Sequence, residues 1–487
     1  MAVVAFGWSL AGTFHFDDYS LWSARAVVSP AGPLELLKPL QSRPLTYLTF
    51  WANYQTAGFS PLAWHLVNLL MHIGSVLLLF AALRRLLPER AAMLAAALFA
   101  VHPLNAEAVN YIFARSTLLC TLLSLAALRS WVNNRPWHAV GWFAGALLAK
   151  EECVTLPLFL LLLNLAASRG RREWKPIAAM LGLSLAAGAR VMLAAMYTPG
   201  AKTGPSAGIS ALEYLSSQGV AILRYLRLLL IPAGLTVDPD LRVNTGWTAW
   251  LAWIAVIALC IAASRIFSPL RAGFWLLAGL ILLLPSSSIF PAADLAADRR
   301  MYLPMIAFAT GGAMLLYTMR IRALIVVCAS LAAISISRCE IWRTELTLWT
   351  EAVRMAPDKL RPRIQLSRAL PPMRALSVLN EAEQTWPLAS EVPAEEGRIY
   401  LDMGESGQAL AKFGRALALE PTNPMAINNR GAALLALGQT DAARLDFQRA
   451  LKIDPCQPNA RANLAHIGVA PPAADSCPEI PVLTVLR

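Results

Sequence analysis

The sequence predicts an all-α membrane protein: a bundle of about eleven transmembrane helices with one further helix at the membrane surface, followed by a short solenoid of helical repeats. Of the 487 residues, 57% are apolar and only 15% are charged, far too little charge for a soluble chain of this length. The apolar residues come in runs near the ~20 residues that cross a hydrocarbon core. The C-terminal part instead contains an internal repeat with a period of about 34 residues.

The apolar runs define the expected transmembrane segments: 1–14, 62–83, 91–110, 116–128, 137–149, 152–167, 176–197, 247–264, 272–290, 301–319 and 323–338. One more apolar stretch, 219–235, carries Arg224 and Arg227 at helical spacing in its middle. Because a charge at the centre of a bilayer is costly, we expect this stretch to be re-entrant or interfacial.

The net charge of +12 is interpreted as membrane topology, and we expect no nucleic-acid partner. Short cytoplasmic loops are usually the basic ones. With the N-terminus inside, they hold 13 Lys or Arg and two acids: 84–90, 129–135, 168–175, 265–271 and the pair Arg320 and Arg322. Eleven of the 14 acids before residue 341 then fall on the exoplasmic side, as does the C-terminal part.

The internal repeat is visible in two nearly identical stretches. The stretch at 413–421 reads FGRALALEP, and the stretch at 447–455 reads FQRALKIDP. This period, with small residues inside and a closing proline, is typical of tetratricopeptide repeats, which are pairs of helices. We expect one degenerate and two good repeats after an opening helix, and three regions: a membrane domain at 1–338, a repeat domain at 339–470 and a tail at 471–487.

The seven cysteines show neither CxxC nor His-Cys metal spacing, which argues against a zinc site. Cys456 and Cys477 lie in the C-terminal part. They could form a disulfide if this part faces an oxidising compartment, and the sequence leaves the pairing open.

Adjacent carboxylates, Asp17 and Asp18, follow the first apolar segment in the sequence HFDDYSLW. Such a pair can act as a general base for an incoming hydroxyl, or as ligands of a divalent cation such as Mg²⁺ or Mn²⁺. The alternative is a solvated helix cap, and spacing alone does not decide among the three.

Other ionisable residues are expected on the same side of the membrane. They are His65, His102, Glu107, Arg115, Lys150, Glu151, Glu152, Asp238, Asp294, Asp298, Arg299 and Arg300. Ionisable groups at a bilayer edge are candidates for function, especially where both signs converge. We expect these residues to line one exoplasmic cavity, in which acids activate a hydroxyl and cations bind a phosphate.

A series of motifs resembles a known family. The stretches are HFDDYSLW, residues 42–72, HPLNAEAVNYIFARSTLL at 102–119, AKEECVTLPLFLLL at 149–162, YLRLLLIPAGLTVD at 225–238 and DRRMYLPM at 298–305, followed by the repeats. Over nearly the whole chain, and in this order, they resemble the transmembrane and tetratricopeptide-repeat O-mannosyltransferases and their bacterial relatives, in the GT-C superfamily of glycosyltransferases.

The resemblance implies a GT-C-type bundle that transfers a sugar, typically mannose, from a polyprenyl-phosphate carrier to a hydroxyl of a protein Ser or Thr on the exoplasmic face. Asp17 or Asp18 would be the base of an inverting attack. The charge on the departing polyprenyl phosphate must be stabilised. The candidates for that role, in order, are Arg299, Arg300, Lys150 and Arg115. His102 and Glu107 would shape the same cavity or tie one loop to another.

Three points stay open at this stage. The acceptor could instead be a glycan or a lipid headgroup, and the chain could be a non-catalytic scaffold that recruits partners through its repeats. The repeat array is short, so it either holds an acceptor or caps the cavity. The bias toward Ala, Leu and Arg indicates a bacterial plasma (inner) membrane; in a eukaryote the equivalent would be the endoplasmic reticulum.

Overall fold

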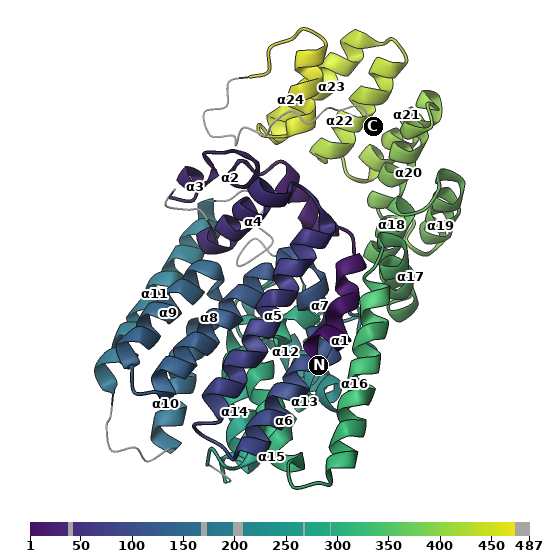
Figure 1. Ribbon diagram of the computed structural model, residues 1–487. Coiled ribbons are helices and arrows are strands. Elements are labelled where there is room, and N and C mark those ends of the chain that lie inside the picture. The colour runs from purple at the N-terminus through teal and green to yellow at the C-terminus, as the bar shows by residue number, and fades with distance from the viewer. Residues whose placement is uncertain (38–41, 167–172, 198–207, 266–267, 293, 473–487) are drawn as a thin grey trace. The chain divides into compact units, whose positions relative to one another are not determined.

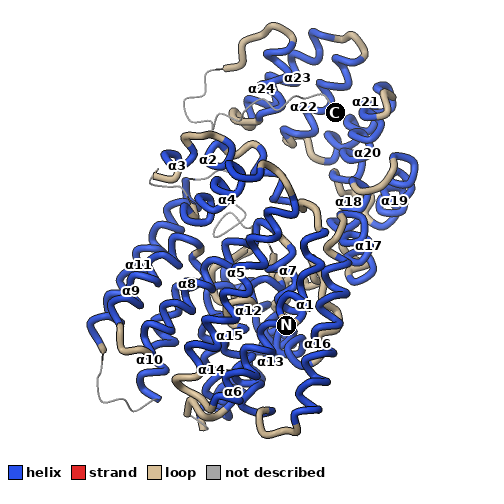
Figure 2. The backbone as a smooth tube through the Cα atoms, viewed as in Figure 1, coloured by secondary structure: helices blue, strands red, loops and turns tan. Residues whose placement is uncertain are grey.

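The computed structural model describes the chain except residues 38–41, 167–172, 198–207, 266–267, 293 and 473–487. The described backbone consists of helices joined by loops and turns (Figure 2), so the predicted all-helical fold is confirmed. The chain divides into two compact units. The membrane unit comprises Met1–Trp22 and Ala26–Thr347, and the repeat unit comprises Ser23–Arg25 and Leu348–Arg487.

The membrane unit is built from helices of very different length (Figure 1). They are α1 (Ala2–Phe6), α2 (Arg25–Val28), α3 (Gly32–Glu35), α4 (Pro44–Ala57), α5 (Pro61–Leu83), α6 (Glu89–Val101), α7 (Ala106–Asn110), α8 (Arg115–Val132), α9 (Pro136–Ala149), α10 (Leu156–Ala166), α11 (Trp174–Tyr197), α12 (Ala211–Leu230), α13 (Trp247–Ser264), α14 (Ala272–Leu283), α15 (Met305–Leu316) and α16 (Ile321–Ile341).

Helix starts follow local sequence signals. Pro44, Pro61 and Pro136 each occupy the first position of a helix, where the missing N–H costs nothing and the fixed φ suits the first turn. Ser210 and Glu213 form a capping box at the start of α12, each side chain bonding the other's backbone N–H. This cap starts α12 at Ala211, earlier than the apolar stretch that begins at residue 219 suggested.

Helix α5 shows how the bundle is arranged for lipid. Its buried polar side chains recur at helical spacing along one face: His65, Asn68, His72 and Ser75. Its exposed side chains include Leu62, Leu66, Leu70 and Leu77. Polar groups inside and leucines outside are the pattern of a helix in a membrane bundle, where polar side chains bond across helices. The chain is an integral membrane protein.

Fewer helices are long enough to cross a bilayer alone than the eleven expected. In the described part of the chain, five qualify by length and composition: Pro61–Leu83, Ile112–Val132, Trp174–Leu193, Trp247–Ser264 and Ile321–Ile341. A sixth would be the pair Glu89–Val101 and Pro103–Asn110, which is bent by 50°. Other expected spans form helices, but α10 and α14 have only 11 and 12 residues, below the ~20 that cross a hydrocarbon core. The number of spans therefore stays a prediction.

The two ends of the membrane unit carry different charged groups. Basic turns meet at one end, and ion pairs between acids and bases lie at the other. At one end, Arg90 donates a hydrogen bond to the carbonyl of Met319, so two of the basic turns meet there. At the other end, ion pairs join Arg43 to Glu151 and Arg299 to Glu107. Helices α5 and α16 run between these ends (Figure 1). Residues 167–172 and 266–267, from two other basic segments, lie outside the described residues.

The membrane unit ends later than residue 338. Helix α16 continues through Arg338 to Ile341, because its apolar face and the buried Arg338 and Cys339 remain packed to its end. The compact unit extends to Thr347, whereas the sequence suggested a boundary between 338 and 339. The expected tail at 471–487 lies outside the described residues from 473 onward.

The repeat unit is a run of antiparallel helix pairs. Its helices are α17 (Glu345–Met355), α18 (Leu360–Arg368), α19 (Pro372–Thr385), α20 (Glu391–Asp402), α21 (Ser406–Leu419), α22 (Pro424–Ala436), α23 (Thr440–Ile453) and α24 (Pro458–His466). An added Cβ on Gly397 would lie 2.8 Å from the ring of Phe413, and one on Gly431 would lie 2.6 Å from the ring of Phe447. The same glycine-to-phenylalanine contact thus recurs at equivalent positions of successive repeats, as the repeat pattern predicts.

The cysteines divide between the two units. Among the described residues Cys120, Cys153, Cys260, Cys328 and Cys339 are free, and all but the half-buried Cys260 are buried. Cys456 is disulfide-bonded. Cys477, the partner considered from the sequence, lies outside the described residues.

Candidate active site

The two adjacent aspartates have different surroundings. They lie in a 3₁₀ helix, η2 (Phe16–Trp22), that begins with a positive φ of 38° at Phe16. Both oxygens of the buried Asp18 accept backbone N–H groups, from His15 at 2.8 Å and from Phe113 at 2.7 Å. Asp18 therefore fastens the first loop to the turn between α7 and α8. A positive φ in a non-glycine residue costs free energy and persists where the surroundings hold it.

Burial raises the pKa of Asp18 to about 7, against the opposing effect of the N–H groups that it accepts. Asp17 is exposed, and its Oδ2 accepts a hydrogen bond from the Tyr111 hydroxyl at 2.9 Å. Burial, followed by the charges of Asp17 and Asp18, holds the pKa of Tyr111 well above its usual range. The tyrosine therefore stays a proton donor, and Asp17 is the carboxylate that an incoming group could reach.

Tyr111 also contacts the main cation of the site. The Arg299 guanidinium lies 5.9 Å from the centre of the Tyr111 ring. Arg299 sits in η8 (Asp298–Met301) and donates to Glu107 twice, from Nη1 at 2.5 Å and from its backbone N–H at 2.9 Å. Although burial opposes the charged form, the carboxylate of Glu107 raises the pKa of Arg299. One tyrosine thus joins a reachable carboxylate to a permanent cation.

A second arginine bonds the acidic residue that precedes Arg299 in the sequence. Arg224, in the middle of α12, donates to Asp298 at 2.7 Å. Its Nη2 is buried and has no hydrogen-bond partner among the described residues. A buried guanidinium N–H without an acceptor is costly, so an anionic ligand at this point would relieve the cost.

A pocket lies beside these residues. Its polar lining comes from Glu107, Asp298, Arg338 and Thr236, and Trp342 is also part of the lining. The hydroxyl of Thr236 is buried without a partner in the described part of the chain. The Trp342 ring stacks on that of Tyr111, with centroids 6.0 Å apart, so the pocket borders the Asp17–Tyr111 pair.

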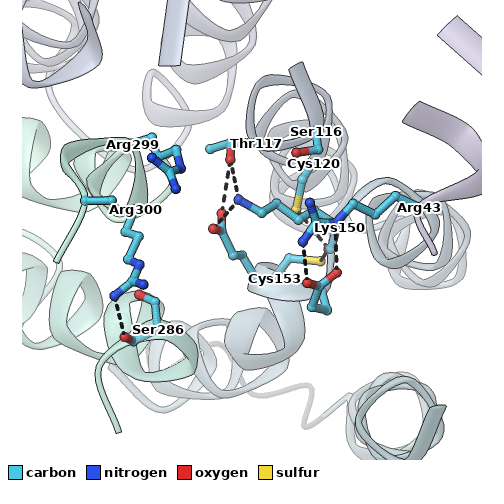
Figure 3. Close-up of polar contacts among 12 residues, drawn as sticks. Arg43, Ser116, Thr117, Cys120, Lys150, Cys153, Ser286, Arg299 and Arg300 are labelled. Carbon is cyan, nitrogen blue, oxygen red and sulfur yellow. Dashed lines mark hydrogen bonds and ion pairs between the residues drawn. The ribbon is translucent and has the colours of Figure 1, made fainter. Parts of the chain in front are cut away.

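The Lys150 cluster extends the charged end of the unit (Figure 3). Lys150 donates to the Thr117 hydroxyl at 2.7 Å and pairs with Glu152, while Arg43 pairs with Glu151 at 2.8 Å. In Figure 3 the Arg299 side chain points toward the Thr117 and Lys150 group, and the Arg300 side chain points away to Ser286.

Two predicted phosphate ligands bond extensively to other parts of the fold. Arg115 is enclosed, bonding the side chains of Asn53 and Asn68 and two backbone carbonyls, with its guanidinium over the rings of Phe50 and Trp64. Arg300 bonds the Tyr214 hydroxyl and three carbonyls between residues 286 and 295. Through these bonds both arginines hold loops in place.

The remaining predicted residues are spread around the end of the membrane unit that carries the Arg299–Glu107 pair. His102 accepts from the backbone N–H of Leu104 and bonds the carbonyl of Leu229, and His65 bonds the carbonyl of Thr13. Asp294 lies 3.9 Å from Arg299, and Asp238 is buried. The structure thus brings Glu107, Asp294, Asp298 and Arg299 together, but it does not give every predicted residue the same neighbours. The single cavity expected for all of them stays a prediction.

Sequence reasoning missed four residues of the site: Tyr111, Arg224, Arg338 and Trp342. Arg224 had a signal, since it is a charge inside an apolar stretch. Arg338 carries the same signal near the end of an apolar helix. The aromatic residues had none, because tyrosine and tryptophan are common at membrane interfaces.

Comparisons with known proteins match segments in both units of the chain. The model of the dolichyl-phosphate-mannose-protein mannosyltransferases matches residues 38–194, and a tetratricopeptide-repeat model matches residues 395–458. Protein O-mannosyl-transferase Tmtc1 of Drosophila melanogaster is 35% identical over 195 residues, which are 36% of this chain and 23% of the relative. Protein O-mannosyl-transferase F38B6.6 of Caenorhabditis elegans is 27% identical over 410 residues, 76% of this chain and 59% of the relative.

A human relative, Protein O-mannosyl-transferase TMTC4, is 35% identical over 199 residues, 32% of this chain and 27% of the relative. The matches thus span between 23% and 59% of the length of these three relatives. The two family models match the two units separately, in the order that the sequence motifs predicted. The chain is a relative of the transmembrane and tetratricopeptide-repeat O-mannosyltransferases.

Proposed function

We propose that this chain is a membrane glycosyltransferase that transfers mannose from a polyprenyl-phosphate carrier to a hydroxyl of a protein Ser or Thr. The relatives are named protein O-mannosyltransferases, which supports the reaction class. The observation that carries the proposal is the exposed Asp17 carboxylate, bonded to Tyr111, whose ring in turn contacts Arg299. The transfer requires a base for the acceptor hydroxyl and a cation for the departing phosphate. Here they lie on either side of the Tyr111 side chain.

Asp17 acts as the general base in this proposal. It takes the proton of the acceptor hydroxyl as that oxygen attacks the anomeric carbon from the face opposite the phosphate, which inverts the configuration. The bond between the anomeric carbon and the phosphate oxygen breaks, and polyprenyl phosphate leaves with the electron pair. Arg299 and Arg224 stabilise the negative charge that develops on it. Arg115 and Arg300, which hold loops, have no part in this step.

Asp18 has a positioning role. Because its two oxygens already accept backbone N–H groups, it offers few lone pairs to a metal ion, and a hard divalent cation usually takes six or more oxygen ligands. Among the described residues no group of three His, Cys, Asp or Glu side chains is placed to hold a metal. The donor set around Asp17 and Asp18 therefore fits a base better than an Mg²⁺ or Mn²⁺ site.

We place the candidate site on the exoplasmic side of the plasma membrane. The contact between Arg90 and Met319 supports this orientation, because it joins two basic turns at the end of the unit opposite to the Arg299–Glu107 pair. In this orientation the C-terminus of α16 delivers the repeat unit to the same exoplasmic side. The repeats would then hold a protein acceptor, as tetratricopeptide grooves commonly bind peptides.

Reconstituted vesicles test the function. They would contain the full-length protein, radiolabelled polyprenyl-phosphate mannose and a pool of proteins and glycans from a cell extract. We expect label on protein, released by base-catalysed β-elimination as O-linked mannose. Label on glycan or lipid would replace the protein acceptor. No transfer by folded protein from any polyprenyl-phosphate sugar would favour a scaffold.

A further inference from the structure

A buried ion pair next to the candidate site has no part in the proposed transfer. Lys150 and Glu152 pair at the end of α9, with side chains only 9% and 17% exposed. Both also bond the Thr117 hydroxyl, Lys150 as donor at 2.7 Å and Glu152 as acceptor at 3.4 Å. Removing both charges from water costs several kcal/mol, and apolar residues of similar size often serve stability equally well. A pair that only supported the fold would have little reason to be ionic.

The backbone that carries this pair is held firmly. The Thr46 hydroxyl bonds the carbonyl of Ala149 at 2.9 Å, and the thiols of Cys120 and Cys153 both approach the carbonyl of Lys150. Residues 151–155 form a 3₁₀ helix, η5 (Glu151–Thr155), that packs against α8, α9 and the segment Leu284–Ser286. The side chains of Lys150 and Glu152 thus start from a fixed backbone, as a binding site requires.

The neighbouring pair, Arg43 and Glu151, anchors the same 3₁₀ helix to the start of α4. It is more exposed, at 28% and 37%, and Arg43 donates to both oxygens of Glu151. Burial opposes the charged form of Glu151, but the charge of Arg43 overcomes it and lowers the pKa of Glu151 to about 2, so this pair stays ionised. Its geometry suits an anchor of η5, whereas Lys150 and Glu152 share their contacts with the Thr117 hydroxyl.

The location of the pair relates it to the sugar. Arg299 points toward the Thr117 and Lys150 group (Figure 3), and Ser286, which accepts from Arg300, lies in the segment that packs against η5. A phosphate bound at Arg299 carries its sugar on the next bond. An ammonium group and a carboxylate side by side match a sugar, since each hydroxyl both accepts and donates a hydrogen bond.

We propose that Lys150, Glu152 and Thr117 form the subsite that binds the hydroxyls of the transferred sugar. Glu152 accepts from one hydroxyl, while Lys150 donates to the same or a neighbouring one. The proposal rests on the proposed function, because it requires a donor whose sugar is attached to a phosphate. It makes these residues the determinants of which hexose is transferred.

The test compares two probes that differ only in the sugar. Full-length protein in lipid nanodiscs would be titrated with polyprenyl-phosphate mannose and with sugar-free polyprenyl phosphate of the same chain length. We expect Glu152→Gln to weaken binding of the mannosyl lipid by about ten-fold or more, the usual value of a hydrogen bond to a charged group. Binding of the sugar-free lipid should stay within about two-fold of wild type.

Controls separate recognition of the sugar from folding. Glu340→Gln changes a carboxylate in an exposed pair with Arg343, and it should leave the affinity for both lipids unchanged. Thr117→Val removes one hydroxyl with little change of shape. It should weaken binding of the mannosyl lipid only. It keeps the test decisive if Glu152→Gln does not fold.

Each outcome is distinguishable. An equal loss of affinity for both lipids in Glu152→Gln and Thr117→Val would assign the group to the fold and overturn the inference. Unchanged affinity for the mannosyl lipid in both variants would overturn it as well. If wild type bound neither lipid, the proposed function itself would fail. Weaker binding of the mannosyl lipid, together with unchanged binding of the sugar-free lipid, would establish the subsite.

Discussion

Ion pairs in the repeat unit and in the membrane unit follow different rules. In one repeat Lys412 pairs with Glu396 at 2.6 Å, and in the next, Arg430 pairs with Asp446 at 2.6 Å. Glu396 and Arg430 occupy equivalent positions of successive repeats, as do Lys412 and Asp446, yet the acid and the base have exchanged places. The repeats therefore require that a pair be present but do not require which helix carries which charge.

The pairs of the membrane unit have their charges fixed by what lies beside them. Arg299 bonds Glu107 and also contacts Tyr111, which bonds Asp17. In the proposed reaction the cation must face a phosphate, and the carboxylate behind it must only hold it in place. We infer from this comparison that a structural ion pair tolerates exchange of its acid and its base, whereas an ion pair that binds an anionic ligand should not.

Exchanging the charges tests this contrast with the largest expected effect. The double variant Glu107→Arg with Arg299→Glu should lose sugar transfer by roughly a hundred-fold or more, because the phosphate would then meet a carboxylate. Transfer would be measured in reconstituted vesicles at equal amounts of folded protein. The matched control, Arg430→Asp with Asp446→Arg, inverts a pair of the repeat unit and should keep full activity at equal amounts of folded protein. Full activity in the membrane double variant would break the comparison.

Removing the Tyr111 hydroxyl sharpens the membrane side of the comparison. Tyr111→Phe keeps the ring beneath Arg299 but deletes the hydrogen bond to Asp17, which should lower kcat by about ten-fold, the value of a bond to a charged group. The KM for the donor lipid should stay the same, since the hydroxyl does not bind phosphate. A raised KM with unchanged kcat would show that Tyr111 binds substrate and does not position the base.

Adding one methyl group tests the packing of the repeats. Gly431→Ala would bring a Cβ within 2.6 Å of the Phe447 ring and should destabilise the repeat unit by about 1–3 kcal/mol. At Gly414, also inside a helix, an added Cβ meets no atom of the described residues within 4 Å, so Gly414→Ala should stabilise by up to ~1 kcal/mol. Chemical denaturation of the full chain, followed by a probe in the repeats, would measure both. Equal effects would contradict the packing account.

The last prediction concerns the pH dependence due to Asp18. Burial raises the pKa of Asp18 from 3.8 to about 7, so between these values the folded protein holds a proton that the unfolded chain has released. The stabilising contribution of that proton is complete below about pH 4 and is lost as pH rises through about 7. Asp18→Asn should flatten this part of the curve of melting temperature against pH. A wild-type curve that rises from pH 5 to pH 7 would contradict the sign.

Patterns along the chain predicted most of the fold. The regular offset between similar stretches predicted the helix pairs, since Gly397 and Gly431 must each face a phenylalanine of the partner helix. Apolar runs predicted the helices of the bundle. They did not predict the number of spans, because α10 and α14 are shorter than a bilayer is thick and an apolar run does not show where its helix bends.

The candidate site was harder to predict. The motif with Asp17 and Asp18 located the carboxylates, but only the fold distinguishes them, since Asp18 is buried on two backbone N–H groups and Asp17 is exposed. From the sequence, both Arg115 and Arg299 were candidate phosphate ligands, because both are cations expected on the exoplasmic side of the membrane. The structure encloses the first among asparagine side chains and backbone carbonyls, and sets the second against Tyr111. Such partners come from distant segments, and spacing in one sequence does not reveal them.

The central claim is that Asp17 is the base, and comparing the two adjacent aspartates tests it most directly. Asp17→Asn and Asp18→Asn would be reconstituted at equal folded amounts with radiolabelled polyprenyl-phosphate mannose, and their melting temperatures would be recorded. Our account predicts that Asp17→Asn melts like wild type but transfers at least about a hundred-fold more slowly, the usual value of a general base. Asp18→Asn should melt differently while the molecules that remain folded retain transfer. Transfer at the wild-type rate by Asp17→Asn would contradict the account.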